Sequence, residues 1–266
     1  MAFDVKNAMT RWIAVLGSLF AMAAFAQDAP KEIDGRKSGY LFMSAETRAL
    51  QEDDFLNPGF FAIDQGKALW AKAEGAQGKS CASCHQDAEK TMVGIAARYP
   101  EYDRKLGRVM DLETRINQER MDKMGTSGWD WESPELLAMT AYLSLQSRGM
   151  PVNVSVDGPA APYFAAGRAF YQQKRGQLNL ACSDCHEDRS GQYLRGDVIS
   201  QGQVNAFPIY RLLWDALGSR QRMFVWCNRS VRAEPYAQGA PDYMALELYV
   251  AWRGRGLAIE APGVRR

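Results

Sequence analysis

The stretch Cys182-Ser183-Asp184-Cys185-His186, followed further along the chain by Cys227, decides the fold of this protein. Its CxxCH pattern is typical of c-type haem attachment, in which two thiols form thioethers to one porphyrin and the adjacent histidine ligates the iron. Cys81-Ala82-Ser83-Cys84-His85 repeats the pattern earlier in the chain. The sequence therefore predicts two covalently bound haem c groups, attached through Cys81, Cys84, Cys182 and Cys185.

An internal repeat connects the two motifs. Gly66-Lys67-Ala68-Leu69-Trp70 precedes the first motif and Gly167-Arg168-Ala169-Phe170-Tyr171 precedes the second, each glycine standing 15 residues before the first cysteine. The match continues after the motifs, at Pro100 and Pro208 and again at Pro134 and Pro241. Such self-similarity indicates two homologous units. Apolar residues at helical spacing predict an all-α fold of two tandem cytochrome c-like domains with long loops.

The N-terminus has the pattern of a secretory signal peptide. Basic Lys6 and Arg11 precede an apolar run over residues 12–25, and Ala24-Phe25-Ala26 forms an A-x-A cleavage site. We expect residues 1–26 to be removed on export to the bacterial periplasm. The run is short for a spanning helix, so no membrane span is predicted. A retained membrane anchor is the alternative interpretation of this segment.

Composition divides the rest of the chain. Residues 27–57 are polar and predict an N-terminal arm, whereas residues 58–150 predict the first cytochrome c-like domain. The β-branched, proline-bounded segment 151–160 predicts a linker, and residues 161–266 predict the second domain, with the active-site haem. Thirty-two Lys and Arg against 31 Asp and Glu leave a net charge of +1, which argues against nucleic acid as a partner.

The axial ligands of the irons are restricted by histidine count. The chain has 2 histidines, His85 and His186, and each belongs to a CxxCH motif, so bis-histidine ligation within the chain is excluded. Cys227 belongs to no such motif and is the candidate distal ligand of the second haem. A thiolate ligand donates electron density and lowers the haem potential. The alternative is that Cys227 is a buried, inert small hydrophobe.

The first haem lacks a matching cysteine. The repeat offset of 108 places Glu119 at the position of Cys227, and a carboxylate is a poor ligand for a low-spin haem. Either Met121 or Met124 is the distal ligand, or the iron is five-coordinate or weakly ligated by Glu119. The chain has 12 methionines, so core packing is the alternative role for both.

A family resemblance rests on the C-terminal third. Val231-Arg232-Ala233-Glu234-Pro235-Tyr236 and Leu246-Glu247-Leu248-Tyr249-Val250-Ala251-Trp252-Arg253-Gly254, with both CxxCH units, the late cysteine and the closing residues 260–266, resemble the SoxA cytochromes of the bacterial thiosulfate-oxidising Sox system. CxxCH by itself indicates only a cytochrome c, whereas the two longer strings are specific. The resemblance covers nearly all of the chain after residue 26.

The resemblance implies an activity and partners. It implies a heterodimer with the cytochrome SoxX, which joins thiosulfate to a cysteine of the carrier SoxYZ and releases two electrons. It implies that Cys227 carries a persulfide and is the catalytic sulfur. Joining two sulfur anions calls for nearby cations. Four arginines stand near Cys227 in the sequence: Arg220, Arg222, Arg229 and Arg232.

Two positions depart from the family pattern. The family carries an arginine four residues before the cysteine, proposed to bind thiosulfate, and this chain has Met223 there. Arg222 is next to it and is the candidate substrate residue. Members with two haems carry a cysteine where this chain has Glu119. The departures therefore concern the substrate site and the ligation of the first haem.

Two other functions fit a dihaem cytochrome. One is a plain electron carrier without sulfur chemistry. The other is a thiosulfate dehydrogenase, which couples two thiosulfates into tetrathionate and needs no carrier protein. The position of Cys227 after the second CxxCH motif favours the SoxA interpretation, because a dehydrogenase of that kind is expected to have its distal cysteine after the first haem.

Overall fold

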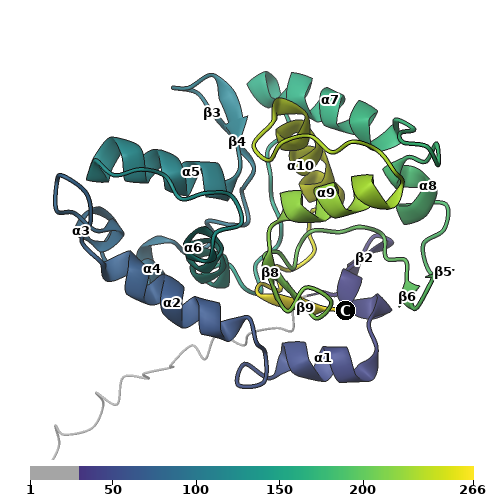
Figure 1. Cartoon of the computed structure of the whole chain (residues 1–266), viewed down its shortest axis with the longest axis horizontal. Helices are drawn as coiled ribbons and strands as arrows, with labels where there is room; N and C mark the ends of the chain where they lie inside the picture. The colour runs from purple at the N-terminus through teal and green to yellow at the C-terminus, as the bar shows by residue number, and fades with distance from the viewer. Residues whose placement is uncertain (1–29) are drawn as a thin grey trace, which may run out of the picture.

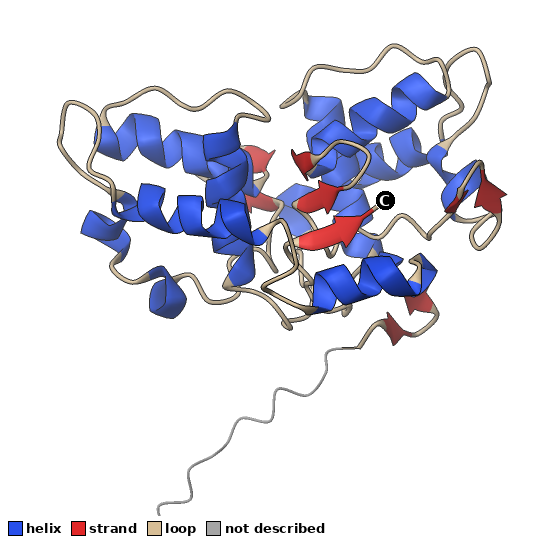
Figure 2. Ribbon diagram, turned by 60° about the horizontal axis from the view of Figure 1, so that its bottom comes forward, coloured by secondary structure: helices blue, strands red, loops and turns tan. Residues whose placement is uncertain are grey.

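The computed structural model describes residues 30–266, which form two helical halves lying side by side (Figure 1). The predicted signal peptide, residues 1–26, lies outside the described residues. Each half is built on a pair of crossing helices with a short CxxCH helix beside them (Figure 2). The internal repeat of the sequence is thus a repeat of structure.

The first half contains five α-helices, one π-helical turn and one hairpin within residues 60–145. Its hairpin ends directly before the helix that carries Glu119. In chain order the elements are α2 (Phe60–Ala71), α3 (Cys81–His85), α4 (Ala88–Thr91), β3 (Glu101–Asp103), β4 (Arg108–Met110), α5 (Leu112–Glu119), the π-helical η2 (Arg120–Met124) and α6 (Pro134–Leu145).

The second half repeats the main elements in the same order, without counterparts of α4 and η2, and adds a second hairpin after its CxxCH helix. The extra hairpin lies where the second repeat is longer than the first. In chain order the elements are η3 (Gly158–Ala160), α7 (Ala161–Gln172), α8 (Cys182–His186), β5 (Tyr193–Leu194), β6 (Asp197–Val198), β7 (Ile209–Arg211), β8 (Ala216–Gly218), α9 (Arg220–Ser230), α10 (Pro241–Arg253) and β9 (Gly263–Arg265).

A glycine lets the two long helices of each half cross at close range. A Cβ atom on Gly66 of α2 would come within 2.2 Å of the Ala138 carbonyl oxygen of α6. A Cβ on Gly167 of α7 would come within 2.0 Å of the Ala245 carbonyl oxygen of α10. The glycine that opens each repeat motif in the sequence therefore marks the helix crossing.

The helices α6 and α10 form the centres of the two halves. Every residue of α6 from Leu136 to Ser144 is buried, and so is every residue of α10 from Tyr243 to Ala251. A helix buried on all sides belongs to a core. Ser133 caps α6 by accepting a hydrogen bond from the Leu136 amide, and Pro134 occupies its first turn, where no amide donor is needed.

The all-α prediction is correct for the main elements and wrong in one respect, because residues 30–266 also form nine short strands. In the second half, β7 pairs antiparallel with β8 and parallel with β9. Each of these strands has three residues, too few for alternation to be visible in the sequence. The third strand of the sheet comes from the C-terminal residues, which only the folded chain brings back to β7.

The arm, the predicted linker and the C-terminal tail join the two halves. The arm forms a hairpin of β1 (Glu32–Ile33) and β2 (Arg36–Lys37), a 3-10 turn (Gly39–Phe42) and α1 (Ala45–Glu52), which packs against β9. Val152 in the linker segment donates its amide to Leu257 O and accepts from the Gly256 amide. The segment between the halves is therefore held by hydrogen bonds to the tail.

Candidate functional site

The short helix α8 sets the geometry of the second CxxCH motif. The Asp184 side chain accepts a hydrogen bond of 2.8 Å from the Ala181 amide, so the helix begins at Cys182. Residues three apart lie on the same helix face, which directs Cys182 and Cys185 to one side. In the first half Ser80 caps the equivalent helix α3, where Ser83 bonds back to Ser80.

His186 is oriented as a metal ligand. Its Nδ1 lies 2.8 Å from the Ser200 carbonyl oxygen, which requires Nδ1 to carry the proton and leaves Nε2 with a free lone pair. Gly202 packs against the ring, and a Cβ there would come within 2.8 Å of the His186 Cγ. Burial lowers the pKa of His186, which favours the neutral imidazole that binds iron.

Cys227 lies near the second motif. Ser219 caps α9 by accepting from the Arg222 amide at 3.1 Å, and Cys227 follows eight residues after this cap. Burial, together with charge interaction with Cys182 and Cys185, raises the pKa of the Cys227 thiol to about 12, and this interaction indicates that the three sulfurs lie near one another. Such a thiol stays protonated at neutral pH, whereas coordination to a metal deprotonates it.

These residues fit a covalent haem. Two thiols on one face of α8, a histidine with Nε2 free, and a half-buried sulfur on a different helix are donors that suit the group. Bound there, a haem c would supply one-electron oxidation and reduction. His186 would be its proximal ligand and Cys227 its distal ligand.

Arg211 is the arginine whose positive charge acts on the Cys227 thiol, and the sequence prediction did not include it. Its charge opposes the rise in the pKa of Cys227. The predicted substrate residue Arg222 donates to the Leu217 carbonyl oxygen at 2.9 Å, and its guanidinium lies 4.3 Å from the centre of the Trp214 ring. Arg211 stands on β7, remote in sequence, and spacing alone carried no signal for it.

The other three predicted arginines have different neighbours. Arg220 bonds to the buried Glu247 at 3.1 Å. Arg232 bonds to Gln177 at 3.4 Å, and Arg229 is exposed on α9. The four arginines near Cys227 in the sequence therefore do not gather around it in the fold.

The first motif has a different distal residue. Glu119 lies eight residues after Asp111, the cap of α5, and it is 3.7 Å from Arg115 in an ion pair. His85 packs beside Trp70, with ring centres 5.8 Å apart. Met121 is 48% exposed and Met124 is 4% exposed. Of the two methionines named from the sequence, Met124 is the one inside the fold.

The π-helical turn η2 explains a change in the repeat offset. Arg120 pairs with Glu74 in the first half. In the second half Asn228, at an offset of 108 from Arg120, accepts a hydrogen bond from Arg175, so the same two positions are in contact. After the turn, the Gln77 amide donates to Met124 O, whereas the Leu178 amide donates to Val231 O at an offset of 107. The first half holds one extra residue in this turn, and Glu119 lies before it, in register with Cys227.

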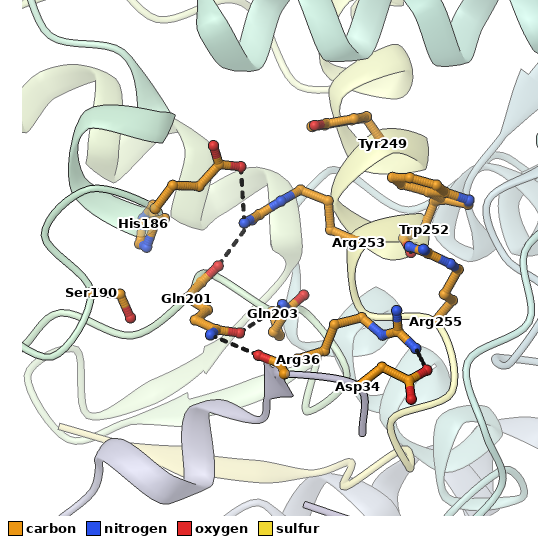
Figure 3. A pocket seen from close by; sticks show the side chains of 12 residues that line it. Asp34, Arg36, His186, Ser190, Gln201, Gln203, Tyr249, Trp252, Arg253 and Arg255 are labelled. Carbon is orange, nitrogen blue, oxygen red and sulfur yellow. Dashed lines mark hydrogen bonds and ion pairs between the residues drawn. The ribbon is translucent and has the colours of Figure 1, made fainter. Parts of the chain in front are cut away.

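A cavity of about 470 Å³ lies between the arm and the second half (Figure 3). His186 forms part of its wall, together with Tyr249, Trp252 and three arginines: Arg36, Arg253 and Arg255. Arg253 pairs at 3.2 Å with Glu187, which also lines the cavity. Cys227 does not line it, so this cavity lies on the histidine side of the motif.

A buried acidic cluster joins the halves. Asp111 and Glu113 from α5 and its cap lie with Glu247 of α10, their oxygens within 4.8 Å of one another. Gln221 donates to Asp111 at 2.9 Å and to Glu247 at 3.2 Å. Burial and the neighbouring charges raise the pKa of Glu247 to about 7 and the pKa of Glu113 well above its usual value. The cluster is part of the contact between the halves.

The fold and the two CxxCH helices define a c-type cytochrome. Residues 65–152 match the family model SoxA/TsdA, cytochrome c domain. The chain is 44% identical over 232 residues to the L-cysteine S-thiosulfotransferase subunit SoxA of Rhodovulum sulfidophilum, an alignment that covers 87% of this chain and 81% of that protein.

Further relatives agree with this class. The SoxA subunit of Paracoccus pantotrophus is 45% identical over 86% of this chain and 78% of its own length. The crystal structure of SoxXA from P. pantotrophus superposes with a TM-score of 0.85 at 44% identity and covers 88% of both chains. The chain belongs to the SoxA family, which confirms the resemblance seen in the sequence.

Proposed function

We propose that this protein joins thiosulfate to a cysteine of a carrier protein, as an L-cysteine S-thiosulfotransferase subunit. The observation that carries the proposal is the position of Cys227, a half-buried thiol beside the two haem-attaching cysteines of the second motif. The names of the relatives support it, since they are thiosulfotransferase subunits with 44–45% identity. A plain electron carrier is served by a neutral methionine ligand and has no need of a thiol in that place.

The overall reaction is an oxidation. A carrier thiol and thiosulfate give the carrier S-thiosulfonate, one proton and two electrons. In our proposal the Cys227 sulfur, as thiolate or as persulfide, first bonds to the sulfane sulfur of thiosulfate, and the two electrons released pass to the SoxX-type partner cytochrome. The carrier thiolate then attacks that sulfane sulfur, and the original Cys227 species is the leaving group. Covalent catalysis of this kind divides one difficult step between two easier ones.

The proposal includes two haem c groups. The second is held by Cys182, Cys185 and His186 with Cys227 as distal ligand. The first is held by Cys81, Cys84 and His85. Met124 is the better methionine candidate for its distal ligand because it is buried, whereas Met121 is 48% exposed. The first haem then passes electrons or has a supporting role.

The proposed partners are a SoxX-type cytochrome, a SoxYZ-type carrier and thiosulfate, and the proposed place of action is the periplasm. A superposed relative was crystallised as SoxXA, which supports the first partner. Among residues 30–266, no helix is long and apolar enough to cross a membrane.

The test is to mix the haem-loaded protein and its SoxX-type partner with thiosulfate and the carrier, and to weigh the carrier by mass spectrometry. We expect the mass of one S-thiosulfonate on the carrier cysteine, and none with Cys227→Ser. Tetrathionate in solution with an unmodified carrier would instead establish the dehydrogenase. No product of either kind, with normal reduction of the haem, would leave the plain electron carrier.

A further inference from the structure

The two halves place an arginine on opposite sides of the same contact. In the first half Arg115 of α5 forms an ion pair with Asp103 of β3. In the second half the equivalent contact joins Met223 of α9 to Arg211 of β7, with the Arg211 Nη1 3.7 Å from the Met223 Sδ. Arg115 and Met223 each lie four residues after the cap of their helix. The guanidinium thus comes from the helix in one half and from the strand in the other.

This contact lies on the face of α9 that carries Cys227. Residues four apart on a helix are neighbours, so Met223 and Cys227 face the same side. Arg222 lies five residues before Cys227 and therefore points away from the helix face that carries Met223 and Cys227, by more than a quarter of a turn around the helix axis. Arg211 is therefore the arginine whose guanidinium contacts position 223, four residues before Cys227.

Arg211 is held in place without a carboxylate side chain as its partner. Its Nε donates to the main-chain oxygen of Arg266 at 2.7 Å, and its guanidinium lies over the rings of Trp214 and Trp226, 5.1 and 4.7 Å from their centres. No Asp or Glu side chain among residues 30–266 is within ion-pair distance of it, whereas Arg220 pairs with Glu247 at 3.1 Å. A fixed, partly buried guanidinium whose two terminal nitrogens have no carboxylate side chain to bind is suited to an anion.

We propose that Arg211 binds the sulfonate oxygens of thiosulfate beside Cys227, in the role that the family pattern gives to an arginine at position 223. The inference rests on the proposed function for the identity of the anion. A planar guanidinium can donate two parallel hydrogen bonds to such oxygens. The two tryptophans hold the side chain in place, and Met223, which contacts its Nη1, offers it no countercharge.

The test is isothermal titration calorimetry of thiosulfate into the haem-loaded protein with its SoxX-type partner, without carrier and without oxygen. We expect Arg211→Gln to weaken binding about 10- to 100-fold, as for loss of a hydrogen bond to a charged group. Arg168→Gln removes the same charge from an exposed position of α7 in the same half and is expected to bind within about twofold of the native protein. The haem absorption spectrum confirms loading of each variant.

A second variant guards against misfolding. Arg211→Met combined with Met223→Arg returns the guanidinium to the helix, and we expect it to restore most of the affinity. Native-like binding by Arg211→Gln would overturn the proposal, and so would a native protein that binds no thiosulfate. If native binding depends on Arg211 but no S-thiosulfonate forms on the carrier, the anion site stands and the proposed function fails.

Discussion

Glu119 and Cys227 occupy the same position in two helices of the same construction. Each follows the residue that caps its helix, Asp111 or Ser219, by eight residues, and both precede the point at which the π-helical turn changes the repeat offset. The two halves therefore differ at the place where a distal ligand would reach the iron. A carboxylate stands there in one half and a half-buried thiol in the other.

Replacing Cys227 by methionine should separate haem binding from catalysis. Cys227→Met keeps Cys182, Cys185 and His186, so we expect full haem attachment. Exchange of an anionic thiolate for a neutral thioether should raise the potential of this haem by on the order of 100 mV. A redox titration measures the shift, and the mass of the carrier measures turnover, which should be lost. Turnover at the native rate would remove Cys227 from the mechanism.

Introducing a cysteine at Glu119 should give the first haem a thiolate ligand. Glu119 is in register with Cys227, so Glu119→Cys places sulfur where the second half has it. We expect a second thiolate-type signal in the electron paramagnetic resonance spectrum of the oxidised protein. Gln118→Cys, one residue earlier and turned by about 100° around the helix, is the control and should leave the spectrum unchanged. Identical spectra for both variants would contradict the equivalence.

The acidic cluster should make stability fall as pH rises. Burial raises the pKa of Glu247 from 4.5 to about 7, so the folded protein holds a proton that the unfolded chain has released. The free energy of unfolding therefore decreases as pH rises from about 4.5 to about 7. Glu113 contributes in the same direction, since burial and its acidic neighbours raise its pKa.

Glu113→Gln removes one of these charges. We expect it to raise the free energy of unfolding by about 1 kcal/mol at pH 8, or the melting temperature by about 2–4 °C, and to have little effect at pH 5. Thermal melting across that range measures the difference. Glu101→Gln, at an exposed site of β3, is the control and should shift neither. Equal effects of Glu113→Gln at both pH values would show that the cluster does not hold a proton.

The helix crossing in the second half should not tolerate a methyl group. Gly167→Ala forces a Cβ to within 2.0 Å of the Ala245 carbonyl oxygen, which is backbone and cannot turn aside. We expect a loss of about 3 kcal/mol in the free energy of unfolding, measured by chemical denaturation. The control is Gly254→Ala, where the nearest atom, 3.2 Å away, is the end of the flexible Gln203 side chain. Similar losses for both would mean that α7 and α10 adjust freely.

The repeat and the haem attachment could be predicted because their signals are local. Cys182, Cys185 and His186 stand within five residues, and their chemistry does not depend on the rest of the fold. The glycine before each motif was visible as part of the repeat, although its role at the helix crossing was not. The short strands were missed because three residues show no alternation, and the partner strand β9 comes from the C-terminus.

The sequence by itself determined that this chain carries two CxxCH units, that Cys227 and Glu119 occupy equivalent positions of the internal repeat, and that the chain resembles the SoxA family. Only the tertiary structure indicated that Arg211 is the candidate arginine for the anion site beside Cys227. Four candidates were close in the chain, yet helix rotation turns Arg222 aside and a buried carboxylate binds Arg220. Arg211 lies against Met223 of α9 because the hairpin of β7 and β8 folds back directly before this helix, and strands of three residues are too short for alternation to predict that packing.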